Sequence, residues 1–349
     1  MKPVPNLIFK SSPCTIGHIP VSWKIFFQSS RTSSTMGDTA ESLTPDIMYG
    51  WRVNALKNWI KEKDGILKME DFQRAGHLDQ FHYLGLECND DIIDILHINA
   101  KKKVLDVGSG IGGPARYISW KTGCKIMGLD IQESLVQAST EISNLLNMAN
   151  HLSFRACDAT TDSFADTTTY DAFYSILVFL HIPQNPRKIL FGKLFTSLKE
   201  SGSFCIEDYC LKDPSNPFTK AEMGALTEIV GAVYVPCQDD YKNQLEQAGF
   251  QNVQFEDLTE TWSQWTIGRR NRFLEKKDEH VALHGEQVYK NMETFYNTVA
   301  DLFIGGRLAG ARITGSQGKV NADLEAGRNL IKTKKRGFEE IMANVIRQI

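Results

Sequence analysis

Residues 103–120 read KVLDVGSGIGGPARYISW. A β-prone run ends at Asp106 and Val107, four glycines follow between positions 108 and 113, and the pattern then becomes helical. Glycine has no Cβ atom, so it adopts unusual φ angles and lets a ligand approach the backbone at the start of the helix. The stretch therefore predicts a strand–turn–helix unit whose turn lies against a bound ligand.

Outward from this unit, short β-prone runs alternate with helical or turn-rich segments. Alternation of this kind indicates parallel strands joined by helices that cover both faces of the sheet. The sequence therefore predicts an α/β fold, with a doubly wound, mostly parallel, seven-stranded sheet. The expected strands are 103–107, 125–130, 152–158, 170–176, 201–208, 250–258 and 308–316.

Flanking this sheet, the sequence divides into further segments. Apolar residues at three- and four-residue spacing predict an N-terminal helical cap over 38–98. The sheet domain is expected over 99–318, and an amphipathic helix over the C-terminal tail, 319–349. Residues 1–37 are expected to stay outside the fold.

The first 37 residues contain no aspartate or glutamate, are rich in serine, and carry Lys2, Lys10, Lys24 and Arg31. This composition is typical of an organellar transit peptide, and equally of a disordered leader without a role. A mitochondrial location is expected in the first case and a cytoplasmic location in the second.

Composition excludes several classes of function. Hydrophobic residues make up 42% of the chain and charged residues 23%, as in ordinary globular proteins. The net charge of −3 gives no reason to expect a nucleic-acid partner. No apolar run reaches the roughly 20 residues of a transmembrane helix. The seven cysteines form no CxxC pair or zinc-like cluster, so no metal site is expected.

Three acidic residues distinguish between the ligands that a glycine turn can bind. Gly108, Gly110 and Gly113 fit the dinucleotide pattern GxGxxG, but Asp106 would repel a pyrophosphate and attract a cationic group. Asp130, at the end of the second strand, can accept hydrogen bonds from ribose hydroxyls, and Asp158 can accept one from an adenine amino group. Together these acids favour S-adenosylmethionine.

The sequence resembles the class I S-adenosylmethionine-dependent methyltransferases. DVGSGIGG (106–113) is similar to the first motif of that family. Further stretches resemble its small-molecule N-methyltransferases of the sarcosine/dimethylglycine and phosphoethanolamine types, and the resemblance covers about 78–315. These stretches are LVFLHIP (177–183), IEDYC (206–210), DLTETW (257–262) and GGRLAGARITG (305–315).

The resemblance implies the Rossmann-like methyltransferase fold and a set of residues around the cofactor, S-adenosyl-L-methionine. The implied cofactor-binding residues are Asp106, Gly108, Ser109, Gly110, Gly112, Asp130, Ile131, Gln132, Asp158, Ala159 and Ser175.

His181 follows the fourth strand, and in the phosphoethanolamine enzymes the matching histidine works in the active site with a tyrosine. It is the candidate catalytic residue, either orienting the acceptor or accepting its proton. A histidine in the core with a satisfied hydrogen bond is the structural alternative. The candidate substrate-binding residues are Tyr83, Asp208, Tyr209 and Arg307.

Two departures from the resembling enzymes bear on the acceptor. Leu177 stands where those enzymes usually have an aspartate suited to a cationic amine. Residues 221–241 contain no lysine or arginine, whereas the phosphoethanolamine enzymes need basic residues there for the phosphate. A phosphobase acceptor is therefore disfavoured, while Arg307 is expected to be available for a carboxylate.

The sequence therefore predicts a methyltransferase that acts on a small-molecule acceptor, by N-methylation of an amine or amino acid. Two alternatives remain at this point. One is an NAD-dependent oxidoreductase that uses the glycine turn for a dinucleotide. The other is a non-catalytic partner protein that keeps the fold and binds the cofactor.

Overall fold

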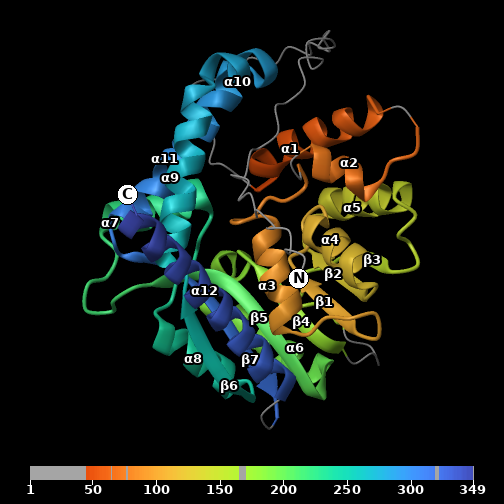
Figure 1. The fold of residues 1–349 in the computed structure, drawn as a ribbon, viewed down its shortest axis with the longest axis vertical. Helices are drawn as coiled ribbons and strands as arrows, with labels where there is room; N and C mark the ends of the chain where they lie inside the picture. The colour runs from red at the N-terminus through yellow and green to blue at the C-terminus, as the bar shows by residue number, and fades with distance from the viewer. Residues whose placement is uncertain (1–44, 64, 76–77, 165–169, 319–321, 349) are drawn as a thin grey trace, which may run out of the picture.

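The computed structural model describes residues 45–63, 65–75, 78–164, 170–318 and 322–348 (Figure 1). The segment 1–37, expected to be a leader or transit peptide, lies outside the described residues. The described chain forms a seven-stranded sheet with strand order β3-β2-β1-β4-β5-β7-β6. The strands are β1 Lys103–Val107, β2 Lys125–Asp130, β3 Leu152–Ala156, β4 Tyr170–Ile176, β5 Leu198–Leu211, β6 Phe250–Asp257 and β7 Leu308–Gln317.

The strands β1 to β5 pair in parallel, while β7 runs antiparallel to both β5 and β6. The prediction of a mostly parallel, doubly wound sheet is confirmed. Along β1, side chains alternate between the two faces, so that Val104 and Leu105 belong to different hydrophobic clusters. Both faces are therefore buried.

Helices cover both faces of the sheet (Figure 1). On the Val104 face lie α1 Pro45–Lys61, α2 Met69–Arg74, α3 Leu86–Ile95, α4 Gly113–Thr122, α5 Glu133–Leu145 and α12 Ala322–Gln348. On the other face lie α6 Gln184–Ser197 and α8 Gln238–Gln247.

The C-terminal helix α12 packs beside α3 across the sheet (Figure 1). Two neighbouring lysines of α12 form ion pairs with the rest of the fold: Lys334 contacts Asp94, and Lys335 contacts Glu256. The expected amphipathic tail is thus a helix docked on the fold.

A buried arginine connects α3 to the sheet below it. Arg312 on β7 forms ion pairs with Glu207 on β5 at 2.8 Å, Glu256 on β6 at 2.8 Å and Asp91 on α3 at 2.6 Å. Glu207 is therefore engaged in the fold, away from ligands.

Three helices lie between β6 and β7: α9 Thr259–Glu275, α10 Lys277–His284 and α11 Glu286–Ile304. Helices α9 and α11 run side by side and extend beyond the sheet to α10 (Figure 1). With η2 Phe179–His181, α7 Lys220–Ala225 and η3 Leu226–Val230, they form the region beyond the carboxyl ends of β4 and β5. Among the described helices, none has the length and apolarity needed to span a membrane.

Candidate active site

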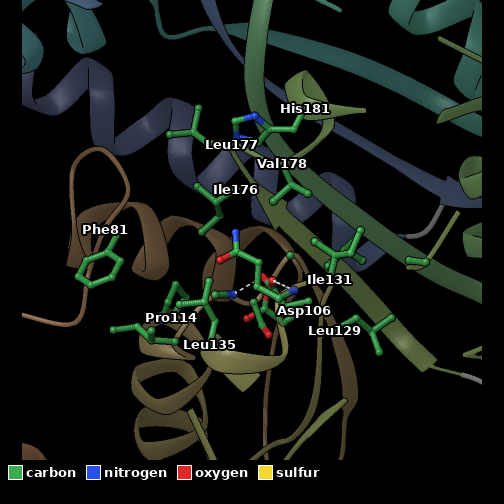
Figure 2. A pocket seen from close by; sticks show the side chains of 18 of the residues that line it. Phe81, Asp106, Pro114, Leu129, Ile131, Leu135, Ile176, Leu177, Val178 and His181 are labelled. Atoms are coloured by element: carbon green, nitrogen blue, oxygen red, sulfur yellow. Dashed lines mark hydrogen bonds between the residues drawn. The ribbon is translucent and has the colours of Figure 1, made fainter. Parts of the chain in front are cut away.

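A cavity of about 290 Å³ opens at the carboxyl ends of the parallel strands (Figure 2). It lies between β1 and β4, where the order of the strands reverses and where open α/β sheets bind their ligands. Figure 2 shows Leu177 and His181 on the side of the cavity opposite Pro114. Most of its lining comes from the segments that follow β1, β2, β3 and β4.

The glycine turn is fixed to the end of β2 through Asp130. The N–H of Gly110 donates to one carboxylate oxygen of Asp130 at 2.8 Å, and the N–H of Gln132 donates to the other at 2.9 Å. Gly110 has φ +53°, and a Cβ atom built on it meets no other atom within 4 Å. The bare backbone at Gly110 therefore leaves open space at the turn.

Gly113 has a different role. A Cβ atom at this position would lie 2.1 Å from the carbonyl oxygen of Asp79. Asp79 also pairs with the fully buried Arg116 of α4 at 2.9 Å. This close packing brings Phe81 and His82 into the cavity lining. The sequence assigned Gly113 to the glycine pattern, but no signal in it pointed to Asp79 or Phe81.

Asp106 lines the cavity and is buried, with 3% of its surface exposed. The hydroxyl of Tyr174 donates to its carboxylate at 2.8 Å. Burial raises the pKa of Asp106 to about 7, against the effect of the Tyr174 hydrogen bond and with a contribution from the charge of Asp130. A cationic group bound beside Asp106 would favour its ionised form.

Asp158 comes just after β3 and also lines the cavity. Its carboxylate accepts hydrogen bonds from the hydroxyl of Thr160 at 2.6 Å and from its N–H at 2.9 Å. The Thr160 hydroxyl is the main reason why the pKa of Asp158 is lowered. Asp158 therefore stays ionised at neutral pH.

Two buried polar atoms of the lining residues are unsatisfied. The Ser109 hydroxyl oxygen and the Gln132 side-chain carbonyl oxygen have no hydrogen-bond partner among the residues that the structure describes. Because buried polar groups are nearly always hydrogen-bonded, both atoms are candidates to contact a group of a bound ligand. Ile131 and Ala159 line the same cavity.

His181 lies in η2, just after β4, and lines the cavity. Its Nδ1 lies 2.8 Å from the carbonyl oxygen of Gly231. A carbonyl oxygen only accepts, so Nδ1 carries the proton and Nε2 is the acceptor in the neutral ring. Burial lowers the pKa of His181, partly offset by the bond to Gly231, so the ring is neutral at pH 7.

A second, smaller cavity of about 50 Å³ adjoins the first, and the two share Phe81, Leu177 and His181. Tyr83 and Tyr209 line it, with their hydroxyls hydrogen-bonded to each other and both rings buried. Tyr83 and Tyr209, both candidate substrate-binding residues from the sequence, thus lie together in this second cavity.

Leu177 connects the two cavities in an unusual backbone conformation. Its φ is +56°, in the left-handed region that branched and bulky residues rarely adopt. Its N–H donates to the carbonyl oxygen of Glu207 at 2.8 Å. Strain of this kind concentrates at functional sites.

Two residues expected at the cofactor do not line either cavity. Ser175 is fully buried within β4, and its hydroxyl donates to the carbonyl oxygen of Val107 at 2.9 Å. Gly112 precedes α4, and a Cβ atom on it would collide with the ring of Phe154. The structure assigns both residues to packing.

Two residues expected at the substrate are also placed elsewhere. Asp208 is fully buried and accepts a hydrogen bond from the Tyr241 hydroxyl at 3.1 Å. Arg307 pairs with Glu222 at 3.3 Å and donates to Asn216 at 3.0 Å. This corrects the expectation that Arg307 is available for a carboxylate, because its guanidinium is already engaged.

The described residues contain no group of three or more histidine, cysteine, aspartate or glutamate side chains arranged for a metal ion.

A family model described as mycolic acid cyclopropane synthetase matches residues 85–312, more than half of the chain. The phosphoethanolamine N-methyltransferase of Plasmodium falciparum is 28% identical over 215 residues, covering 60% of this chain and 76% of that protein. The enzyme of the same name from Triticum aestivum is 29% identical over 259 residues, covering 68% of this chain and 49% of that protein. The chain thus spans about half the length of its wheat relative.

Among solved structures, Haemonchus contortus phosphoethanolamine N-methyltransferase 2 in complex with S-adenosyl-L-methionine superposes with a TM-score of 0.63. The two chains share 17% sequence identity, and the match covers 73% of this chain and 61% of that one. At this identity the superposition supports the fold.

Proposed function

The chain belongs to the mycolic acid cyclopropane synthetase family of S-adenosylmethionine-dependent methyltransferases, and on this premise we propose that it methylates a nitrogen of a small acceptor. Relatives named as phosphoethanolamine and glycine/sarcosine/dimethylglycine N-methyltransferases support the N-directed reaction. Position 177 is a leucine and residues 221–241 contain no lysine or arginine, so that segment supplies no basic residue for the phosphate of a phosphobase.

The observation that carries the proposal is the set of carboxylates in the large cavity. Asp130 would accept from the ribose hydroxyls, Asp158 would lie at the adenine, and Asp106 would face the cationic amino-acid end. The unsatisfied oxygens of Ser109 and Gln132, and the open space at the turn, fit such a ligand. When bound, S-adenosylmethionine supplies an electrophilic methyl carbon.

The protein contributes alignment, exclusion of water and a proton acceptor. Methyl transfer is an in-line displacement, so positioning the nucleophile is the main requirement. Leu177 and Val178 give the acceptor side an apolar wall, which keeps water from the reacting atoms. The Nε2 of His181 is the basic atom in this wall and accepts a hydrogen bond or a proton from the acceptor.

A dinucleotide-dependent oxidoreductase would need to place a pyrophosphate near the buried carboxylate of Asp106, which lines the cavity. Equilibrium titrations with S-adenosylhomocysteine and with NADH separate the two functions. We expect S-adenosylhomocysteine to bind and NADH not to bind. Binding of NADH alone would contradict the proposal.

Turnover separates an enzyme from a non-catalytic cofactor-binding protein. Methyl transfer from labelled S-adenosylmethionine is measured on a panel of amines and amino acids, with the acceptor-free reaction as background. We expect at least one nitrogen acceptor to be methylated. Tight cofactor binding without transfer to any acceptor would favour the partner-protein alternative.

A further inference from the structure

The small cavity beside the proposed methyl-donor site is cationic. Arg269 on α9 and Arg52 on α1 both line it. The Nε and Nη2 atoms of Arg269 are buried and have no hydrogen-bond partner among the described residues. The next residue, Arg270, pairs with Asp301 at 3.3 Å. Arg270 thus has a carboxylate partner within the protein, whereas Nε and Nη2 of Arg269 have no partner among the described residues.

Aromatic rings surround the guanidinium of Arg269. Its carbon lies 4.5 Å from the ring centre of Tyr296, 4.6 Å from that of Trp265 and 5.2 Å from that of Tyr83. Cation–π contacts of this kind hold a guanidinium in place without using its N–H groups. The N–H groups on Nε and Nη2 of Arg269 therefore remain to bind a ligand.

Arg52 belongs to the same arrangement. Its Nη2 donates to the Tyr296 hydroxyl at 2.9 Å, and its guanidinium carbon lies 5.1 Å from the ring centre of Phe81. Helices α1 and α9, which are remote in sequence, thus bring two guanidinium groups to one small cavity.

Among the described residues that line the cavity, none supplies a carboxylate to balance the charge of Arg269. Among the described residues that line it, the two arginines are the charged ones, and no described carboxylate forms an ion pair with Arg269. Keeping the guanidinium of Arg269 away from water is unfavourable without a counter-ion. An anion bound in the cavity would supply that counter-ion.

The tyrosine pair adds a neutral donor. Tyr83 and Tyr209 have two hydroxyl hydrogens between them, and their mutual hydrogen bond uses one. The second hydrogen can be donated to an anion. The remaining walls, Leu180, Val230 and Met292, are apolar and suit a short hydrocarbon chain.

We propose that Arg269, together with Arg52, binds an acidic group of the methyl acceptor, a carboxylate or a phosphate, and so determines acceptor specificity. The acceptor is a small organic acid whose nucleophilic atom lies at Leu177 and His181, where the two cavities meet. This inference rests on the proposed methyltransferase function and adds the chemical class of its acceptor.

Matched acceptor pairs test the requirement for an acid. Sarcosine is compared with sarcosinamide, β-alanine with its amide, and O-phosphoethanolamine with ethanolamine, using labelled S-adenosylmethionine. The acids are expected to have kcat/KM values about 10- to 100-fold above their neutral partners, as for the loss of a charged hydrogen bond. The carboxylate and phosphate pairs show which acid is bound. Equal use of acids and neutral partners would overturn the inference.

The variants Arg269→Met and Arg270→Met form a matched pair on one helix. Arg269→Met is expected to raise KM for the acid by about 10- to 100-fold, with kcat little changed, and to abolish the preference over the amide. Arg269→Lys should restore part of that preference, because the charge returns without the bidentate geometry. Arg270→Met should behave as wild type. An unchanged acid preference in Arg269→Met would overturn the inference.

If no acceptor of the panel is methylated, direct anion binding decides. Propionate and methyl phosphate are titrated into the complex with S-adenosylhomocysteine, up to about 100 mM, far above the Kd of a specific site. Binding that disappears in Arg269→Met and persists in Arg270→Met supports the inference, and absence of binding overturns it. Failure of S-adenosylhomocysteine to bind would instead contradict the proposed function, so the two failures are distinguishable.

Discussion

Asp130 ends β2, His181 comes after β4, and both line the same cavity, yet they are held by different parts of the chain. Asp130 is fixed by the N–H groups of Gly110 and Gln132, which belong to its own and the adjoining β–α unit. His181 is fixed by the carbonyl of Gly231, at the end of η3 beyond β5. The donor side is thus local in sequence, and the acceptor side is assembled from remote segments.

This difference has a physical consequence for specificity. The donor side is built from backbone groups of the glycine turn and from carboxylates at strand ends, all of which the sheet itself positions. The acceptor side depends on side chains from α1, η2, α9 and α11, which can change without affecting the sheet. We therefore expect substitutions on the two sides to affect different kinetic parameters.

The largest expected effect lies on the acceptor side. In His181→Ala, turnover should fall by about 10²- to 10⁴-fold, because a positioned proton acceptor is lost. Affinity for S-adenosylhomocysteine should stay near the wild-type value. Steady-state rates and calorimetry measure the two quantities, and His151→Ala, an exposed histidine before β3, serves as the control.

The pH dependence of the rate sharpens this test. Because burial lowers the pKa of His181, the rate of the wild type should fall as the pH drops through a pKa below that of an ordinary histidine. His181→Ala should lack this fall. Turnover within about threefold of wild type would make His181 a structural residue.

The next effect lies on the donor side. Asp130→Ala should weaken binding of S-adenosylhomocysteine by roughly 1.5–3 kcal/mol, because the ribose hydroxyls lose a charged acceptor. Gly110 also loses its hydrogen-bond partner. Calorimetry measures the affinity, with Asp213→Ala, an exposed aspartate after β5, as the control. Wild-type affinity in Asp130→Ala would remove Asp130 from the cofactor site.

The same division explains what the sequence could predict. The strands and the helices that cover them could be predicted from the alternation of β-prone and helical runs. Asp106, Asp130 and Asp158 could be predicted as site residues because they lie at the ends of strands. Consecutive β–α units bring those ends to one edge, so proximity in space follows from the pattern.

The acceptor side could not be predicted in this way. Arg52 and Arg269 lie on helices far apart in sequence, and only their packing around Tyr296 brings them together. Arg307 has the residue type expected for a carboxylate site, but Glu222 occupies it. Residue type and family resemblance indicate chemistry, whereas the pairing of each charged group depends on the tertiary structure.

The smallest expected effect is on the donor side and concerns Asp106, whose ionisation should make the affinity for S-adenosylhomocysteine depend on pH. Burial raises the pKa of Asp106 to about 7 in the free protein, so the group is largely protonated at pH 6 and largely ionised at pH 8. A cationic ligand end binds the ionised form, so affinity for S-adenosylhomocysteine should fall about tenfold between pH 8 and pH 6. Asp158, whose pKa is lowered, stays ionised over this range and cannot cause the change.

The variant Asp106→Asn keeps the size of the side chain and removes its titration. Its affinity for S-adenosylhomocysteine should be lower than that of the wild type at pH 8 and nearly constant down to pH 6. Calorimetry at several pH values, in buffers of different ionisation enthalpy, also counts the proton released on binding by the wild type. If Asp106→Asn retains the full pH dependence, another group governs it. The cationic end of the ligand would then lie away from Asp106, and the local donor side would be held by Asp130 and the glycine turn alone.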